Sequence, residues 1–193
     1  VSCGLVWRYV FQGVFVENHI EVQGRFFALN SFFRSYYSFL ALDDICNDYD
    51  SVYQKLNPFT HMHNVLLCDS VISWCKVFGT DTEECHWKNL IEDHQGFRKC
   101  LLGKLGVTQQ EFRNYQLHVL EFRNKWVVHY EPSYQHKPVP DFDLMLKSAI
   151  VLHTYLRENV SDKFIYSGPV SIEGFGRSVG MAIIDSLKPI EKT

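Results

Sequence analysis

Hydrophobic residues recur at steps of three and four along most of the chain between Phe26 and Leu156. This spacing places apolar side chains on one face of a helix with about 3.6 residues per turn. Five segments show the pattern, and the sequence therefore predicts five amphipathic helices. Their apolar positions are, in chain order, Phe26, Leu29, Phe33, Tyr36 and Leu40; Val65, Cys68, Ile72 and Cys75; Trp87, Leu90, His94, Phe97 and Leu101; Phe112, Tyr115, Val119, Phe122 and Trp126; and Phe142, Met145, Ala149, Leu152 and Leu156.

Cap and turn residues set the expected limits of these helices. Pro58 closes the first segment, because proline disfavours helix at the residue before it. Thr60 is a predicted N-cap for the second helix, which Gly79 ends. The third helix is expected to begin near Thr82. The signal at the fourth is the most specific, because Thr108 followed by Glu111 is a capping box.

The shared spacing is typical of helices that pack nearly antiparallel. The predicted fold is an all-α, up-and-down bundle of about five helices over residues 26–158, within a single domain of residues 1–193. Irregular or short-strand extensions are expected at both ends. Val10–Val16 fits a short strand or hairpin arm, and a glycine-rich stretch from Gly168 leads into a helical turn or strand at Met181–Leu187.

Composition narrows the functional classes. The chain has 193 residues and is 46% hydrophobic, enough for one sizeable core. Its net charge of −3 provides no overall positive field for nucleic acid, so an RNA substrate would need a local basic patch. The six cysteines form no CxxC pair, which indicates reduced thiols in a cytoplasmic protein. Residues 5–16 are apolar but too short to span a membrane and lack signal-peptide flanks, and we expect no membrane association.

The stretch from Arg123 to His129 carries the most specific chemical signal. An arginine is followed by the polar Asn124, four further residues and a histidine, at the end of the fourth predicted helix. This pattern resembles the motif of HEPN domains. The resemblance implies a metal-independent, cofactor-free ribonuclease, usually a toxin or an abortive-infection, antiviral defence effector. It also implies a helical bundle that forms a homodimer around the motif, with an antitoxin or regulatory partner as a further expectation.

Each residue of the motif suits one step of RNA cleavage. His129 is suited to remove the proton of the ribose 2′-hydroxyl and to protonate the leaving 5′-oxygen, because its pKa lies near the working pH. Arg123 is suited to bind the phosphoryl oxygens, where negative charge develops. Asn124 is expected to position the phosphate or orient the histidine. The predicted substrate-binding residues are Lys125, Trp126 and Tyr130, and the two rings could stack on an unpaired base.

An ideal helix does not bring the two main residues together. Arg123 and His129 would point about 120° apart and lie about 9 Å apart along the axis. They converge only if the helix ends or distorts near Val127–Val128, or if a second chain supplies one partner. The alternative interpretation is that His129 caps a helix end, favoured there by the helix dipole, and that Arg123 is a solvated or salt-bridging residue.

Three other patterns have simpler interpretations. Arg113 to His118 nearly repeats the motif but is one residue short, which indicates chance. Metal-ligand residue types occur in two groups whose spacing matches no zinc site, so buried thiols are the simpler interpretation. These groups are His61, His63 and Cys68, and Cys85, His86 and His94. A basic cluster of Arg98, Lys99 and Lys104 is either a solvated helix end or a contact for RNA phosphate.

Two functional hypotheses follow, together with a more general one. The first is a metal-independent endoribonuclease of the HEPN type. The second is a non-catalytic, HEPN-like interaction or RNA-binding module that keeps the motif for structural reasons. The general alternative is an unrelated helical scaffold in which Arg123 and His129 occur by coincidence.

Overall fold

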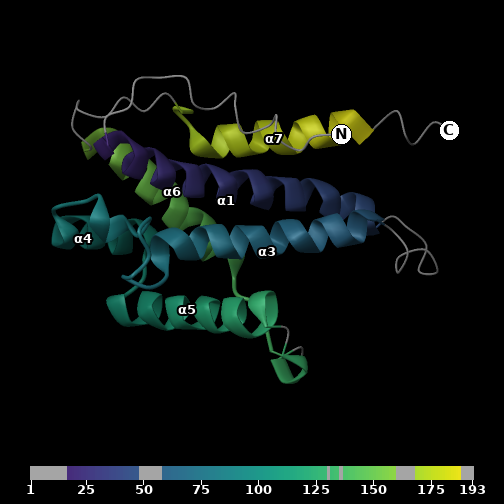
Figure 1. Ribbon diagram of the computed structural model, residues 1–193, viewed down its shortest axis with the longest axis horizontal. Coiled ribbons are helices and arrows are strands. Elements are labelled where there is room, and N and C mark those ends of the chain that lie inside the picture. The colour runs from purple at the N-terminus through teal and green to yellow at the C-terminus, as the bar shows by residue number, and fades with distance from the viewer. Residues whose placement is uncertain (1–16, 48–57, 130, 135–136, 160–167, 188–193) are drawn as a thin grey trace.

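The computed structural model describes residues 17–47, 58–129, 131–134, 137–159 and 168–187, and the part it describes is built from helices (Figure 1). These ranges contain six α-helices. They are α1 (Glu17–Asn47), α3 (Pro58–Phe78), α4 (His94–Leu105), α5 (Gln109–Phe122), α6 (Phe142–Asn159) and α7 (Ile172–Leu187). The predicted all-α bundle is confirmed, although it has six helices rather than about five. Val10–Val16 lies outside the described residues.

The long helix α1 is the centre of the arrangement. It packs against α3 on one side and against α7 on the other, and α5 lies on the far side of α3 (Figure 1). Contacts between Ser35 and Asp69 and between Phe39 and His63 show that α1 and α3 run antiparallel. The helix α6 crosses behind α1 and α3, and α4 packs against α6 at one end. The long helices therefore alternate in direction along the chain.

The face that α1 buries is wider than the predicted stripe. Phe26, Leu29, Phe33 and Tyr36 are buried as expected, whereas Leu40 is 41% exposed. The helix packs against α3 on one side and α7 on the other, so a single apolar stripe is too narrow to cover both contacts. Its buried surface therefore includes further residues, which are Ala28, Phe32, Tyr37, Ala41 and Leu42.

The second predicted helix begins earlier and turns a different face to the core. Its first residue is Pro58, two residues before the expected cap Thr60. Proline is tolerated there because the first helical N–H has no partner within the helix. Val65, expected on the core stripe, is half exposed, and Cys68 and Ile72 are only partly buried. The residues that fill the core are Val71, Trp74, Cys75, Val77 and Phe78.

The third predicted helix begins much later than expected. A loop with a short 3-10 turn at Trp87–Asn89 occupies the first part of the segment, and α4 begins at His94. Asp93 caps α4, since its Oδ1 accepts a hydrogen bond of 2.8 Å from the Gly96 N–H. Trp87 reaches the core from the loop and lies 4.8 Å from Phe97, measured between ring centroids, whereas His94 is exposed.

The C-terminal extension was predicted to be irregular or to form a short strand, with a helical turn or strand at Met181–Leu187, and the structure instead shows a longer helix there. Residues 172–187 form the regular helix α7. Gly176 and Gly180 are buried where α7 meets α1, and a Cβ atom at Gly176 would lie 2.3 Å from the Tyr37 ring. These glycines allow close helix packing rather than breaking the helix. The α6 pattern, in contrast, is confirmed, with Met145, Ala149, Leu152 and Leu156 buried and Phe142 partly buried.

The hydropathy of the helices bears on the expectation about membranes. None of the helices within the described ranges combines the length and apolar character needed to cross a bilayer.

The close approach of α7 to α1 can be tested at Gly176. We expect Gly176→Ala to lower the free energy of unfolding by about 1 to 3 kcal/mol, because the new methyl group meets the buried Tyr37 ring. The matched control is Gly103→Ala on α4, where a Cβ meets nothing within 4 Å. That change should stabilise the protein by about 0.5 to 1 kcal/mol through helix propensity. Urea unfolding of both variants measures the difference, and equal effects would contradict the packing.

Candidate functional site

The helix that carries the motif begins with a confirmed capping box. Thr108 Oγ1 accepts a hydrogen bond of 3.2 Å from the Glu111 N–H, and Glu111 Oε2 accepts one of 2.7 Å from the Thr108 N–H. Two N–H groups without helical partners are thereby satisfied. This start is encoded locally and sets where α5 begins relative to α4.

Contacts with α3 position α5 along its length. Phe112, Val119 and Phe122 are buried, and the Phe112 ring meets Phe78 edge to face at 6.2 Å. The Gln116 side-chain amide donates a hydrogen bond of 2.8 Å to the Phe78 carbonyl oxygen. These contacts hold α5 against the C-terminal part of α3, and the motif begins where α5 ends.

The motif forms a π-helix of six residues, Arg123–Val128. The His129 N–H donates to the carbonyl oxygen of Asn124, five residues earlier, at 3.1 Å. The Glu131 N–H reaches still further back, to the Lys125 carbonyl oxygen, at 2.6 Å. A π segment is rare and is frequently found at functional sites. The helix is distorted, as convergence within one chain would require, and the distortion spans the motif rather than only Val127–Val128, but it does not join Arg123 to His129.

Arg123 points towards α3 and the loop that follows it. Its Nε donates to Asn124 Oδ1 at 3.0 Å, and its Nη1 lies 3.7 Å from Glu83 Oε1. The buried Cys75 thiol lies beside the same guanidinium. Burial raises the pKa of Cys75 to about 12, and the positive charge and hydrogen bond of Arg123 oppose that rise. Arg123 is therefore a partly buried, salt-bridged residue within one chain.

His129 directly follows the π-helix as its C-cap residue. Its side chain is exposed to solvent. The reason is the π segment, which has more residues per turn and so rotates later positions off the α-helical stripe. In the part of the chain that the structure describes, no hydrogen bond, ion pair or ring contact joins Arg123 to His129.

The remaining predicted site residues that the structure describes already contact other parts of the chain. The Lys125 ammonium lies 3.5 Å from a Glu121 carboxylate oxygen and 3.9 Å from one of Glu131. Trp126 is partly buried and packs against the core. Asn124 is exposed, with its amide oxygen occupied by Arg123. Tyr130 lies outside the described residues.

A second polar site lies at the other end of α5. A cleft of about 350 Å³ opens between the loop after α3, the helix α4 and the first turns of α5. Its polar lining comes from these three elements and consists of Asp81, His86, Lys88, Arg98, Gln109, Arg113 and Gln116. No spacing along the sequence links these residues, because they come from a loop and two helices.

The buried His86 orders the loop side of this cleft. Its Nδ1 accepts a hydrogen bond of 3.3 Å from the Lys88 N–H, and its Nε2 lies 3.6 Å from Asp81 Oδ1. Burial lowers the pKa of His86 to about 4, although the Asp81 carboxylate opposes this shift. The imidazole is neutral at pH 7. The hydrogen bond from Lys88 lowers the pKa of Asp81, and the two side chains form an ion pair.

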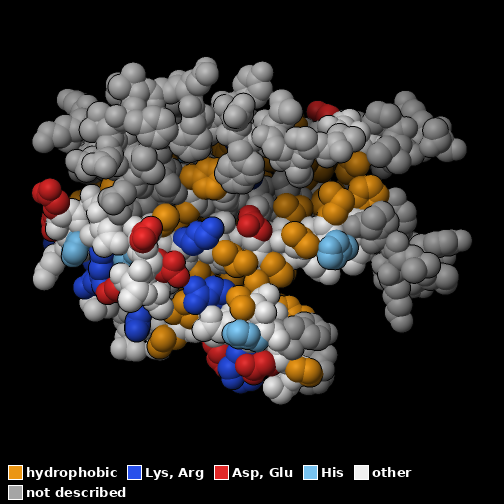
Figure 2. All heavy atoms as spheres, viewed as in Figure 1, with side chains coloured by type: hydrophobic (Ala, Val, Ile, Leu, Met, Phe, Trp, Pro, Cys, Tyr) orange, Lys and Arg blue, Asp and Glu red, His pale blue; other side chains and the backbone are white. Residues whose placement is uncertain are grey.

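The basic cluster predicted from sequence is divided by the fold. Arg98 is partly buried and lines the cleft, whereas Lys99 and Lys104 are exposed. Arg113, which belongs to the near-copy of the motif, faces the same cleft from α5. Figure 2 shows charged side chains gathered around the α4 end of the molecule and apolar ones along α3 and beside α5.

The suspected metal-ligand groups do not assemble in the described part of the chain. No three His, Cys, Asp or Glu side chains there lie close enough to hold a metal ion. The cysteines described are free thiols, namely Cys46, Cys68, Cys75, Cys85 and Cys100.

Comparison with known proteins adds no relative. No family model matches the chain, and neither a curated protein nor a solved structure matches it.

Two buried histidines predict a sensitivity to mild acid. Burial lowers the pKa of His153, like that of His86, to about 4, from 6.5 in an exposed histidine. Between pH 6.5 and 4 the unfolded chain therefore binds protons that the folded state does not bind. The free energy of unfolding decreases as the pH falls through this range. Between about pH 7 and pH 5 each histidine should reduce the free energy of unfolding by about 1 to 2 kcal/mol. Urea unfolding at both pH values should show a smaller loss for His86→Gln and His153→Gln, and an unchanged loss in both would contradict this origin.

Proposed function

We propose that the chain is a metal-independent endoribonuclease of the HEPN type, acting as a toxin or antiviral defence effector. The observation that carries the proposal is the π-helix over Arg123–Val128, which coincides with the motif and ends at the exposed His129. The coincidence of this π-helix with an arginine and a histidine at the motif spacing supports a catalytic site there.

The chemistry follows from the groups that the motif supplies. A neutral His129 accepts the proton of the ribose 2′-hydroxyl, whose oxygen attacks the adjacent phosphorus. The leaving 5′-oxygen then takes a proton, and the products are a 2′,3′-cyclic phosphate and a 5′-hydroxyl end. Arg123 binds the phosphoryl oxygens, where charge builds up, through its planar guanidinium. Neither step uses a cofactor from this chain.

A second copy of the chain would complete the site. Arg123 is turned towards Glu83 within its own chain, and His129 faces solvent. One phosphate can therefore meet both groups if His129 of one protomer approaches Arg123 of its partner across a two-fold axis. Large apolar side chains are exposed on α5, at the last residue of the π-helix and on the loop before α6, and they support contact between two copies of the chain. They are Leu117, Val128 and Val139.

One observation favours a second candidate function. The contacts of Arg123 with Glu83 and Cys75 join α5 to α3 and to the following loop. An arginine so engaged also suits a structural role. The alternative is a non-catalytic, HEPN-like interaction or RNA-binding module, with the same fold and no cleavage.

Cleavage itself is the direct test. Wild-type protein should cleave RNA equally well in the presence of EDTA and leave cyclic phosphate ends. His129→Ala should reduce the rate by at least about a hundredfold, the usual size of a general acid–base contribution. The thermal midpoint should remain near that of wild type, because His129 is exposed and its loss removes few contacts. Full activity of the variant, or a requirement for added divalent metal, would contradict the mechanism.

The shared site predicts complementation between two inactive variants. We expect Arg123→Gln and His129→Ala homodimers to be inactive, whereas a mixed dimer contains one intact pair across its interface. Glutamine is chosen because Arg123 is partly buried and its stem should be kept. Two affinity tags allow the mixed dimer to be isolated and its RNA cleavage measured against the wild type. Activity near half of wild type supports the shared site. A monomeric wild-type protein, or an inactive mixed dimer, would refute it.

A further inference from the structure

The cleft between α4, α5 and the loop after α3 has an excess of positive charge. Three cations line it, Lys88, Arg98 and Arg113, against the single carboxylate of Asp81. The whole chain carries a net charge of −3, so this concentration is local. The motif at the other end of α5 contributes none of the lining residues.

Among the described residues neither arginine of the cleft forms an ion pair, although the charge of Arg113 acts on Asp81 at longer range and helps to lower the pKa of that carboxyl group. Lys88 forms its ion pair with Asp81, which neutralises the one acidic group of the cleft. Arg98 and Arg113 form no ion pair or hydrogen bond with another side chain among the described residues. Arg98 is partly buried, and its charge is thus held in a cleft without a partner. A guanidinium in such a place is suited to bind an anion through two parallel hydrogen bonds.

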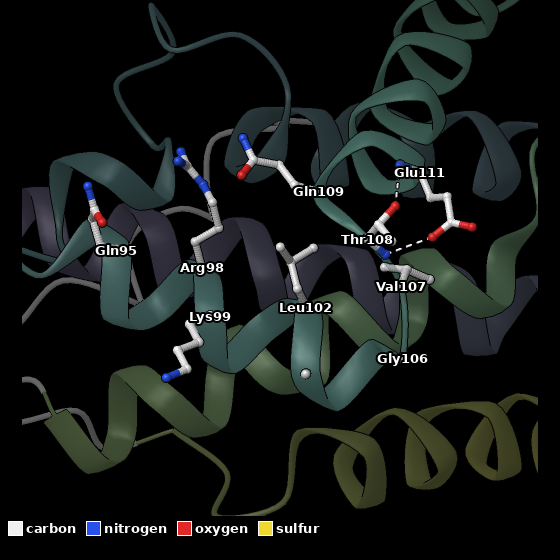
Figure 3. Close-up of a pocket in the computed structure, with 10 residues that line it drawn as sticks. Gln95, Arg98, Lys99, Leu102, Gly106, Val107, Thr108, Gln109 and Glu111 are labelled. Atoms are coloured by element: carbon white, nitrogen blue, oxygen red, sulfur yellow. Dashed lines mark hydrogen bonds between the residues drawn. The ribbon is translucent and has the colours of Figure 1, made fainter.

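The rest of the cleft lining consists of neutral polar side chains and apolar side chains. Gln109 lines the cleft from the first turn of α5. Figure 3 shows the adjoining pocket, which Arg98, Leu102 and Gln109 also line, and there the side chains of Arg98 and Gln109 point to the same region, away from that of Lys99. The apolar lining is provided by Trp87, Leu101, Leu102 and Phe112. The volume of about 350 Å³ suits a small ligand or the end of a chain rather than a folded macromolecule.

We propose that this cleft is a binding site for a phosphate monoester, with Arg98 and Arg113 as its two guanidinium ligands. The two positive charges of these arginines match the charge of a phosphate monoester, which is close to −2 at neutral pH. The group could be presented by a mononucleotide or by the 5′-phosphorylated end of an RNA. The site does not depend on cleavage at His129, which lies at the opposite end of α5.

Calorimetric titration of the full chain at low salt tests the site. The probes are inorganic phosphate, a nucleoside 5′-monophosphate, and a 2′-O-methyl oligoribonucleotide with either a 5′-phosphate or a 5′-hydroxyl. The methylated sugar blocks cleavage, so binding is measured whether or not the chain is a ribonuclease. We expect each phosphate monoester probe to bind, and the 5′-hydroxyl oligonucleotide to bind at least about tenfold more weakly, since it lacks one charge-assisted pair of hydrogen bonds.

Variants of the lining connect that binding to the cleft. Arg98→Gln and Arg113→Gln should each weaken binding of the nucleotide by at least about tenfold. Lys104→Gln is the matched control, because it removes a positive charge from α4 outside the cleft, and it should change affinity by less than about twofold. Asp81→Asn removes the only carboxylate of the lining and frees Lys88, so it should tighten binding. A gain of affinity cannot result from misfolding.

The comparison among probes identifies the source of the phosphate. Tighter binding of the 5′-phosphorylated oligonucleotide than of the mononucleotide assigns an RNA end, and equal or weaker binding assigns a small nucleotide. The proposal is overturned if the 5′-hydroxyl and 5′-phosphate oligonucleotides bind equally, if no phosphate probe binds, or if both arginine variants bind like the wild type.

Discussion

The buried indole of Trp74 joins the helices on which both candidate sites depend. Its Nε1 donates a hydrogen bond of 2.9 Å to Ser148 Oγ, and that hydroxyl donates in turn to the Met145 carbonyl oxygen at 2.9 Å. The ring stacks on Phe78 and meets Tyr115 edge to face. One side chain thus holds α3 against both α6 and α5. A fully buried indole N–H must have a partner, and Ser148 satisfies it without introducing a charge.

The position of α5 decides what its two ends can do. Its first turns, docked beside Phe78, form a wall of the arginine-lined cleft together with α4. Its last turn lies beside Cys75 and Glu83, which hold Arg123. The helix then widens into the π segment and releases His129 to solvent. A single helix therefore carries two chemically different sites, and their separation follows from its length.

The charges at the two sites differ in a way that bears on function. Around the motif, positive side chains are paired, since Arg123 lies near Glu83 and Lys125 lies near Glu121 and Glu131. In the cleft, Arg98 and Arg113 form no ion pair with any residue that the structure describes, and Arg113 interacts with Asp81 only at longer range. A phosphate that approaches the motif must replace an intrachain ion pair, whereas one that enters the cleft meets two arginines that have no ion pair to break. Exposed ion pairs are weak, typically less than about 1 kcal/mol, so the first exchange is physically accessible.

The sequence by itself determined the features that depend on local spacing. Helical periodicity predicted the bundle and the buried face of α6, and Thr108 with Glu111 predicted the start of α5. Helical periodicity gave wrong predictions at positions whose burial or conformation depends on packing against other helices. Leu40 is exposed because α1 has partners on two sides, and Gly176 and Gly180 belong to a helix because Tyr37 and Ala41 pack closely against them. The π-helix and the cleft arise only in the tertiary structure. The first places Arg123 and His129 apart, and the second brings together residues from a loop and two helices, because no local periodicity encodes contacts between distant segments.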